Sequence, residues 1–125
     1  MSRISFTDRE LDIMAVIWEL GSATVRQVQE RLEPDLAYTT VLTVIRNLEE
    51  KGYLRHEQEG RAHRYFPLVE QEEARASVLE RLINKVFSGS PAALITQLVW
   101  TQDLSPDEAA RIRRILERRL QEDDR

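Results

Sequence analysis

The sequence contains no cysteine, and this absence excludes several classes of protein. Without thiols the chain has no disulfide framework, no zinc ribbon, no thiolate copper site and no thiol nucleophile. A long apolar run is also missing, because the longest, Ile13 to Trp18, is far shorter than the roughly 20 residues of a membrane-spanning helix. The N-terminus has no cationic start followed by an apolar stretch, so no export signal is indicated. We therefore expect a cytoplasmic protein without membrane insertion.

The residues that enzymes use are scarce as well. The chain has no glycine-rich phosphate loop, no nucleophile paired with a base and no cluster of carboxylates and histidines. Its two histidines, His56 and His63, are too few for a metal site. We expect no catalytic activity, no cofactor and no metal.

Charged and apolar residues are both plentiful. Of the 125 residues, 42% are apolar and 32% are charged, which is enough for a buried core and too balanced for a disordered chain. The length fits one domain, or a small domain with an oligomerisation arm. The net charge of −4, from 22 acidic and 18 basic residues, argues weakly against nucleic acid as a partner.

The N-terminal half begins with two helices that carry their own start signals. Thr7 and Glu10 form a capping box, and Gly21 ends this first helix. Thr24 and Gln27 form a second capping box, which opens a short helix. The predicted inward residues are Leu11, Met14, Ala15 and Trp18 of the first helix and Val25, Val28 and Leu32 of the second.

A third helix and a hairpin follow. The helix spans Tyr38 to Lys51 and stops at Gly52. Two β-prone runs, Tyr53–Glu57 and Arg61–Phe66, flank a loop that contains glycine. Three helices followed by a hairpin is the order of a winged helix-turn-helix. The predicted fold class is therefore mainly α with a small β-hairpin.

The third helix has two contrasting faces. Its predicted buried stripe is Val41, Val44, Ile45 and Leu48, and its other face is Thr39, Thr40, Thr43, Arg46 and Asn47. The second face carries no acid, and hydroxyls, an amide and a guanidinium are groups that contact phosphates and base edges in the major groove. The alternative is an ordinary solvated face, although such a face more often carries Glu, Lys and Gln. A protein-interaction helix would more often expose Leu, Phe or Met there.

The hairpin region adds positive charge. From Lys51 to Arg64 there are four cations, the others being Arg55 and Arg61, against Glu57 and Glu59. This local balance of +2 favours phosphate contact, because DNA affinity depends on local contacts rather than on total charge. The alternative is that these arginines only promote solubility.

The C-terminal half is predicted to be helical throughout. One helix spans Glu70 to Phe87, a second begins at Ser90-Pro91, and a third begins at Ser105-Pro106. The apolar side chains of the first helix fill two adjacent stripes, which is wider than packing on a single neighbour requires. The alternatives are a monomeric core and a surface shared across a two-fold axis.

We expect the shared surface, and hence a homodimer with a DNA-binding domain at residues 1–69 and a helical dimerisation domain at residues 70–125. Two such DNA-binding domains, here called heads, related by a two-fold axis predict a palindromic operator with half-sites about 10 bp apart, or a multiple of that spacing. The predicted dimerisation residues are Val78, Leu79, Leu82, Ile83, Val86, Phe87, Leu94, Leu98, Ile112, Ile115 and Leu116.

Several stretches resemble the penicillinase repressor family, the relatives of the β-lactamase and methicillin-resistance repressors. The resemblance is carried by 36–43, by Leu48 to Leu54, by Glu59 to Tyr65 and by 103–108, and it spans about residues 6–120. It implies a bacterial transcriptional repressor that binds operator dyads and controls resistance or related genes. The candidate DNA-contacting residues are Tyr38, Thr39, Thr40, Thr43, Arg46, Asn47, Lys51, Arg61 and Arg64.

The resemblance also implies a route to derepression. Several relatives are inactivated when a membrane sensor with a metalloprotease domain triggers cutting in the dimerisation region. The comparable bond here is Gln97–Leu98, where the relatives that are cut carry Asn-Phe. Another branch of the family senses copper through cysteines, and this chain has none.

Overall fold

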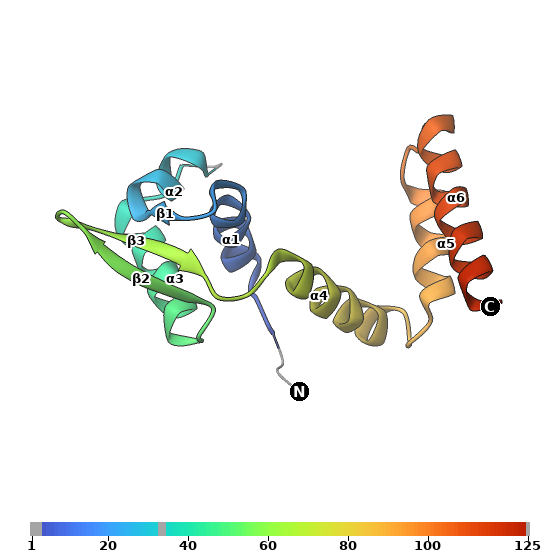
Figure 1. The fold of residues 1–125 in the computed structure, drawn as a ribbon, viewed down its shortest axis with the longest axis horizontal. Helices are drawn as coiled ribbons and strands as arrows, with labels where there is room; N and C mark the ends of the chain where they lie inside the picture. Colours follow the sequence, from blue (N-terminus) through green and yellow to red (C-terminus); the bar gives the residue numbers. More distant parts are fainter. Residues whose placement is uncertain (1–3, 33–34, 125) are drawn as a thin grey trace. The chain divides into compact units, whose positions relative to one another are not determined.

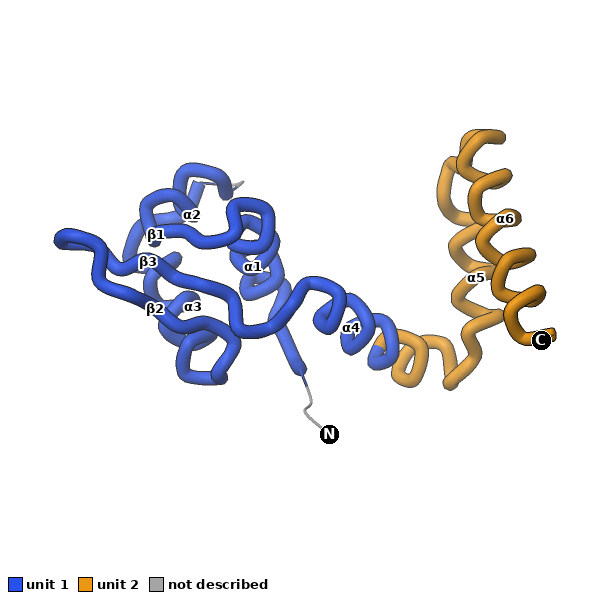
Figure 2. Tube along the Cα trace, viewed as in Figure 1, with its two compact units in different colours: residues 1–81 blue, residues 82–125 orange. Residues whose placement is uncertain are grey.

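The computed structural model describes residues 4–32 and 35–124. The chain divides into two compact units, residues 1–81 and 82–125 (Figure 2). In the first unit lie α1 (Asp8–Leu20), β1 (Ala23–Thr24), α2 (Val25–Arg31), α3 (Tyr38–Glu50), β2 (Leu54–Glu59) and β3 (Ala62–Pro67). Helix α4 (Gln71–Val86) crosses from the first unit into the second, which also holds α5 (Pro91–Thr101) and α6 (Pro106–Asp123) (Figure 1).

The first unit is a winged helix. The predicted third helix and hairpin are confirmed to within two residues at each end. The hairpin is joined by β1, which gives an antiparallel sheet in the order β1-β3-β2. Strand β1 was not predicted, because its two residues show no alternation and are held only by pairing with Arg64 and Tyr65 of β3.

The capping boxes explain where the first two helices begin. The hydroxyl of Thr7 accepts from the amide of Glu10 and that of Thr24 accepts from the amide of Gln27, and in each box the second side chain bonds back to the cap. Gly21 ends α1 at φ 84°, a backbone conformation that glycine adopts without strain. These predictions are confirmed.

The core of the first unit lies between α1, α2, α3 and the sheet. Its fully buried side chains include Ile13, Met14 and Ile17 of α1, Val28 of α2, Val41, Ile45 and Leu48 of α3, and Leu54 of β2. The buried stripe of α3 is as predicted except for Val44, which is only half-buried.

The inward face of α1 differs from the prediction. Met14 is fully buried and Trp18 is half-buried and packs against the core, as predicted, but Leu11 is only half-buried and Ala15 is exposed, so the predicted face is wrong at Ala15. The buried stripe instead runs through Glu10, whose carboxylate binds the amide of Thr7 at 2.8 Å. Because α1 is apolar on most sides, the bonds of Glu10 decide which of two overlapping stripes faces inward.

The first unit includes the beginning of α4. Ala74 is buried, and the hydroxyl of Ser77 donates to the carbonyl of Ile4 at 3.0 Å. The compact unit therefore reaches residue 81, whereas the head was expected to end at residue 69. A division of folding at 69/70 stays a prediction.

The second unit has little interior of its own. Ser90 and Ser105 cap α5 and α6, each followed by proline at the first helical position, as predicted. Among the described residues from 82 to 124 no side chain is buried. None of the helices in the described part of the chain is long and apolar enough to span a membrane.

Candidate nucleic-acid interface

Helix α3 presents the predicted polar face to the surface. Tyr38, Thr39, Thr40, Thr43, Arg46 and Asn47 are all exposed. The hydroxyl of Thr43 donates to the carbonyl of Thr39 at 2.9 Å, so its oxygen remains an acceptor for a donor group outside the helix. The first three turns of α3 carry no carboxylate, because its acids are confined to Glu49 and Glu50.

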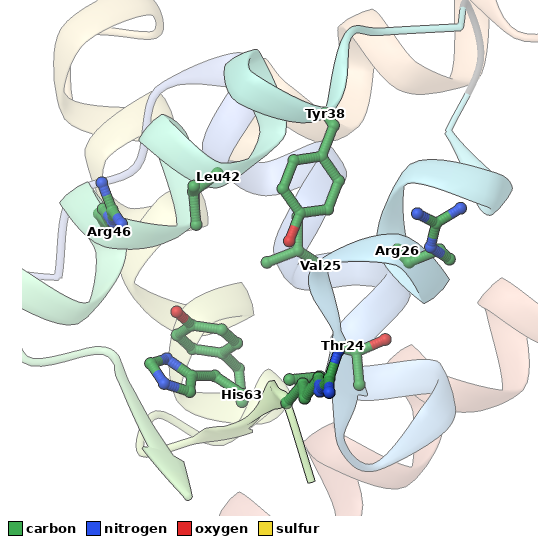
Figure 3. A pocket seen from close by; sticks show the side chains of 10 residues that line it. Thr24, Val25, Arg26, Tyr38, Leu42, Arg46 and His63 are labelled. Atoms are coloured by element: carbon green, nitrogen blue, oxygen red, sulfur yellow. The ribbon is translucent and has the colours of Figure 1, made fainter. Parts of the chain in front are cut away.

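A hollow of about 400 Å³ opens beside this face, between α2, α3 and the hairpin. It is lined by Thr24, Val25, Arg26, Tyr38, Leu42, Arg46, Arg61, Ala62, His63 and Tyr65. Figure 3 shows Arg46 and Arg26 on opposite sides of the Tyr38 and Leu42 side chains. The lining includes three arginines and no carboxylate, so an anion that enters the hollow meets positive charge from α2, α3 and the loop of the hairpin.

The three arginines of this surface, Arg26, Arg46 and Arg61, are available to an external anion. None of them forms an ion pair with any residue in the described part of the chain, and all three are exposed. Arg26 was not among the predicted contacts. Its sequence signal was present, since it is the second residue of α2 and follows the Thr24 cap, but nothing local indicated that α2 would line the same hollow as the hairpin loop.

Tyr65 lies in the hollow and is almost completely buried. Its burial raises the pKa of its phenol, and the charge of Glu49 acts in the same direction while Arg46 opposes it. The phenol is therefore neutral at physiological pH. Tyr65 therefore lines the hollow together with Arg46 without adding negative charge.

Two predicted contacts are engaged with the protein itself. Lys51 donates from Nζ to Glu10 Oε1 at 2.8 Å, with the Glu10 side chain 5% exposed. Arg64 binds both carboxylate oxygens of Glu59, each at 2.9 Å, and is absent from the hollow. The structure thus brings Tyr38, Arg46 and Arg61 together but directs Lys51 and Arg64 elsewhere.

The two histidines flank the end of α3. His56 pairs through Nδ1 with Glu49, and its ring stacks on that of His63 with centroids 4.4 Å apart. His63 also lines the hollow, and its side chain is exposed. No group of three or more metal-ligating side chains that would hold an ion occurs among residues 4–32 and 35–124.

The predicted dimerisation residues are accessible. On α4, Val78, Leu79, Leu82 and Val86 are exposed, and so are Leu98 of α5 and Ile115 and Leu116 of α6. The others, Ile83, Phe87, Leu94 and Ile112, are half-buried. Trp100 of α5 was not predicted as part of this surface, yet it is 82% exposed.

The predicted cleavage site lies inside a helix. Gln97 and Leu98 occupy the middle of α5, and both side chains are exposed. The carbonyl oxygen of Gln97 accepts a hydrogen bond from the hydroxyl of Thr101 at 2.7 Å. A protease that cuts this bond has to unwind α5 locally, because an intact helix does not present an extended backbone.

Comparison with known proteins agrees with the winged-helix architecture. The sequence profile of the penicillinase repressor family matches residues 6–118. The methicillin resistance regulatory protein MecI of Staphylococcus aureus is 29% identical over 112 residues, which cover 88% of this chain and 91% of MecI. The transcriptional regulator BlaI of Mycobacterium tuberculosis is 37% identical over 113 residues, which cover 87% of this chain and 80% of that regulator.

A solved structure is also similar. It is the solution structure of monomeric Bacillus licheniformis BlaI in complex with the blaP half-operator. The match has a TM-score of 0.50 at 30% identity, and it covers 58% of this chain and 90% of that one.

Proposed function

This chain belongs to the penicillinase repressor family, and from that premise we propose that it is a transcriptional repressor that binds operator DNA as a homodimer. Its relatives include a methicillin resistance regulatory protein and a transcriptional regulator, and a third, Bacillus licheniformis BlaI, has been solved in complex with a half-operator. The genes it controls are antibiotic-resistance genes or related ones.

The observation that carries this proposal is the hollow, whose lining has no acid and includes Arg26, Arg46 and Arg61, none of them ion-paired with a residue that the structure describes. Three guanidinium groups without carboxylate partners repel one another unless anions lie between them. The phosphates of a DNA strand are spaced anions of the required sign, and arginine binds them bidentately. Arg26 and Arg61 therefore hold the DNA backbone from the α2 side and the hairpin side of the hollow beside α3.

Helix α3 reads the sequence from the major groove. The side chains of Thr39, Thr40 and Asn47 supply donors and acceptors for base edges, and Arg46 reaches a guanine edge or a phosphate. Leu42 is half-buried beside them and offers an apolar contact to a thymine methyl group. The face of an interaction helix would instead expose several large apolar side chains.

The second unit forms the dimer. A 44-residue unit whose described side chains are all at least partly exposed has no core with which to offset its conformational entropy. Exposed apolar residues recur on α4, α5 and α6, and a second copy covers the same set of residues by two-fold symmetry. The operator is accordingly palindromic, with one head on each half-site.

Release from the operator follows from scission of the Gln97–Leu98 bond by a protease coupled to a membrane sensor. The cut separates Leu98 and the rest of α5 from the residues before it, so the apolar surface of the dimer is divided. A monomer binds a half-operator with one head rather than two, and the lost second contact lowers the affinity. Incubation of the protein with its sensor, followed by mass spectrometry, tests this step: an intact chain with released DNA contradicts it.

The central test is a mobility-shift titration on the DNA upstream of the protein's own gene. We expect the wild-type protein to bind this DNA far more tightly than unrelated DNA of equal length, and Arg46→Gln to weaken or broaden the recognition. Arg75→Gln is the matched control, because it removes the same charge from an exposed position on α4 outside the hollow. Equal affinity for both DNAs overturns the proposal.

A further inference from the structure

The wing, which is the β2–β3 hairpin, is hydrogen-bonded through Arg64 to the turn before β1 and to the first turn of α2. From Arg64 on β3, Nε and Nη2 donate to the two oxygens of Glu59, each at 2.9 Å. The third nitrogen, Nη1, donates to Ser22 Oγ and to Gln27 Oε1, both at 3.3 Å. The side chain of Arg64 is only 24% exposed, although it belongs to a hairpin that projects from the head. These contacts join the end of β2, the turn before β1 and the first turn of α2.

The contacts occupy most of the donors of this guanidinium. An arginine side chain has five N–H groups in a fixed, planar arrangement. The three guanidinium nitrogens of Arg64 form four hydrogen bonds, all of them to groups of the protein itself. The bidentate part of the fork, which matches a phosphate, is held by a carboxylate. A phosphate would have to displace Glu59 to take its place.

These hydrogen bonds lie where the sheet narrows from three strands to two. Strand β1 pairs with β3 only at Ala23↔Tyr65 and Thr24↔Arg64. From His63 toward the loop, β3 has β2 as its only neighbour in the sheet among the described residues. A two-stranded ribbon is only marginally stable in water, so its direction depends on what holds its base.

A second link runs through Gln27. Its Oε1 accepts from Arg64 and also from the backbone amide of Thr24 at 2.9 Å, which is the capping bond of α2. Arg64 is thereby connected to the start of the helix that carries Arg26, while the hairpin that it holds carries Arg61. Both of those arginines line the hollow.

We propose that Arg64 is a positioning residue that clamps the wing to the first turn of α2 and so fixes the separation of Arg61 and Arg26 across the DNA-binding hollow. The proposal rests on the proposed DNA-binding function. It assigns Arg64 no phosphate of its own. The mutual hydrogen bonds lower the pKa of Glu59 and raise that of Arg64, so the pair stays charged through the physiological range.

The sign of the effect of Glu59→Gln tests the clamp. If Arg64 clamps the wing, then Glu59→Gln loosens it and weakens operator binding, by about tenfold as for the loss of one charge-assisted hydrogen-bonded pair. If Arg64 instead contacts a phosphate, Glu59→Gln removes a competing carboxylate and tightens binding. Arg64→Gln should weaken binding by a similar factor, and the double variant should be no weaker than either single variant, because both lose the same clamp. Tightening by Glu59→Gln overturns the proposal.

The matched control is Glu57→Gln. Glu57 lies on the same strand, opposite Arg64 in the register of β2 and β3, but its carboxylate pairs with Arg55 at 2.9 Å, and the four hydrogen bonds of Arg64 go to other residues. Its replacement removes the same charge from the wing without removing a hydrogen bond of the clamp, so it should leave operator affinity unchanged or raise it slightly. A loss equal to that of Glu59→Gln overturns the proposal, because the effect would then belong to any wing carboxylate.

A measurement without DNA separates the clamp from the proposed function. Backbone ¹⁵N relaxation of the free protein should show lower order parameters for Gln58 to His63 in Glu59→Gln and Arg64→Gln, and unchanged ones in Glu57→Gln. Unchanged order parameters in all three variants overturn the clamp. A loosened wing in a protein that binds no operator supports the clamp and overturns the repressor function instead.

Discussion

The salt dependence of operator binding should distinguish the arginines of the hollow from Lys51. Arg26, Arg46 and Arg61 of each head form no ion pair with the residues that the structure describes, so a dimer in which all three reach phosphate has six phosphate-contacting cations. Each neutralised phosphate adds about −0.9 to the slope of log K against log salt, so six contacts give a wild-type slope of about −5.4. Arg61→Gln removes two contacts per dimer and should reduce the slope to about −3.6. Lys51→Gln should leave the slope unchanged, because its ammonium group is already bound by Glu10.

Lys51→Gln should act on stability instead. Glu10 is 4% exposed and would keep only its bond from the amide of Thr7. Leaving a buried charged acceptor underpaired costs about 1–3 kcal/mol, and the lower part of that range applies because the side chain of Lys51 is 40% exposed. Urea unfolding should show this loss for Lys51→Gln and not for Arg61→Gln.

Fluorescence anisotropy with labelled operator, from about 50 to 200 mM salt, measures the slopes directly. Arg75→Gln is again the control for loss of a positive charge outside the hollow. The reasoning is refuted if Lys51→Gln flattens the slope as much as Arg61→Gln does, since phosphate would then have displaced Glu10. A wild-type slope near zero would show that the hollow does not face DNA at all.

Three further outcomes are expected. Leu82→Glu places a charge in the exposed apolar surface of α4 and should give a monomer in sedimentation analysis. Asn84→Glu, on another face of the same helix, should leave the dimer intact. A Leu82→Glu protein that remains dimeric would show that the interface lies elsewhere. Ile45→Ala, at a fully buried position of α3, should lower the free energy of unfolding by about 2–5 kcal/mol in urea, and a loss below about 1 kcal/mol would mean that the core is not packed as described. Burial raises the pKa of Tyr65 above its ordinary value of 10.0, so the phenol loses its proton at a lower pH in the unfolded chain than in the folded one. The stability that this burial contributes is complete below the unfolded pKa and is lost as the pH rises through the folded pKa. Tyr65→Phe should therefore reduce the alkaline loss of stability, and an identical alkaline unfolding curve would contradict the burial of the phenol.

The elements that sequence predicted well are those whose signals are local. Both capping boxes, the glycine that ends α1, and the two β-prone runs with the glycine-containing loop between them lie within a few residues of the structure that they specify. The polar face of α3 is likewise visible as a helical period, because its buried partners Val41, Ile45 and Leu48 fix its orientation.

What sequence did not predict depends on partners far along the chain. Strand β1 consists of two residues and exists because β3 pairs with it some 40 residues later. The inward face of α1 depends on Lys51, which satisfies the buried carboxylate of Glu10 from the end of α3. No periodicity within α1 contains that information.

Ion pairing within the chain also explains how a protein with a net charge of −4 carries a positively charged surface. Several acids of the first unit are paired with a cation of the chain: Glu10 with Lys51, Glu57 with Arg55, and Glu59 with Arg64. Charges paired in this way have weak fields beyond a few ångströms, and salt screens them further. The basic residues that raised the local charge count are therefore largely engaged in neutralising acids. The field that reaches a phosphate comes from Arg26, Arg46 and Arg61, which have no such partner in the described part of the chain. Through the loss of charge alone, replacing Arg26, Arg46 or Arg61 should therefore weaken DNA binding much more than replacing a cation that is paired with an acid.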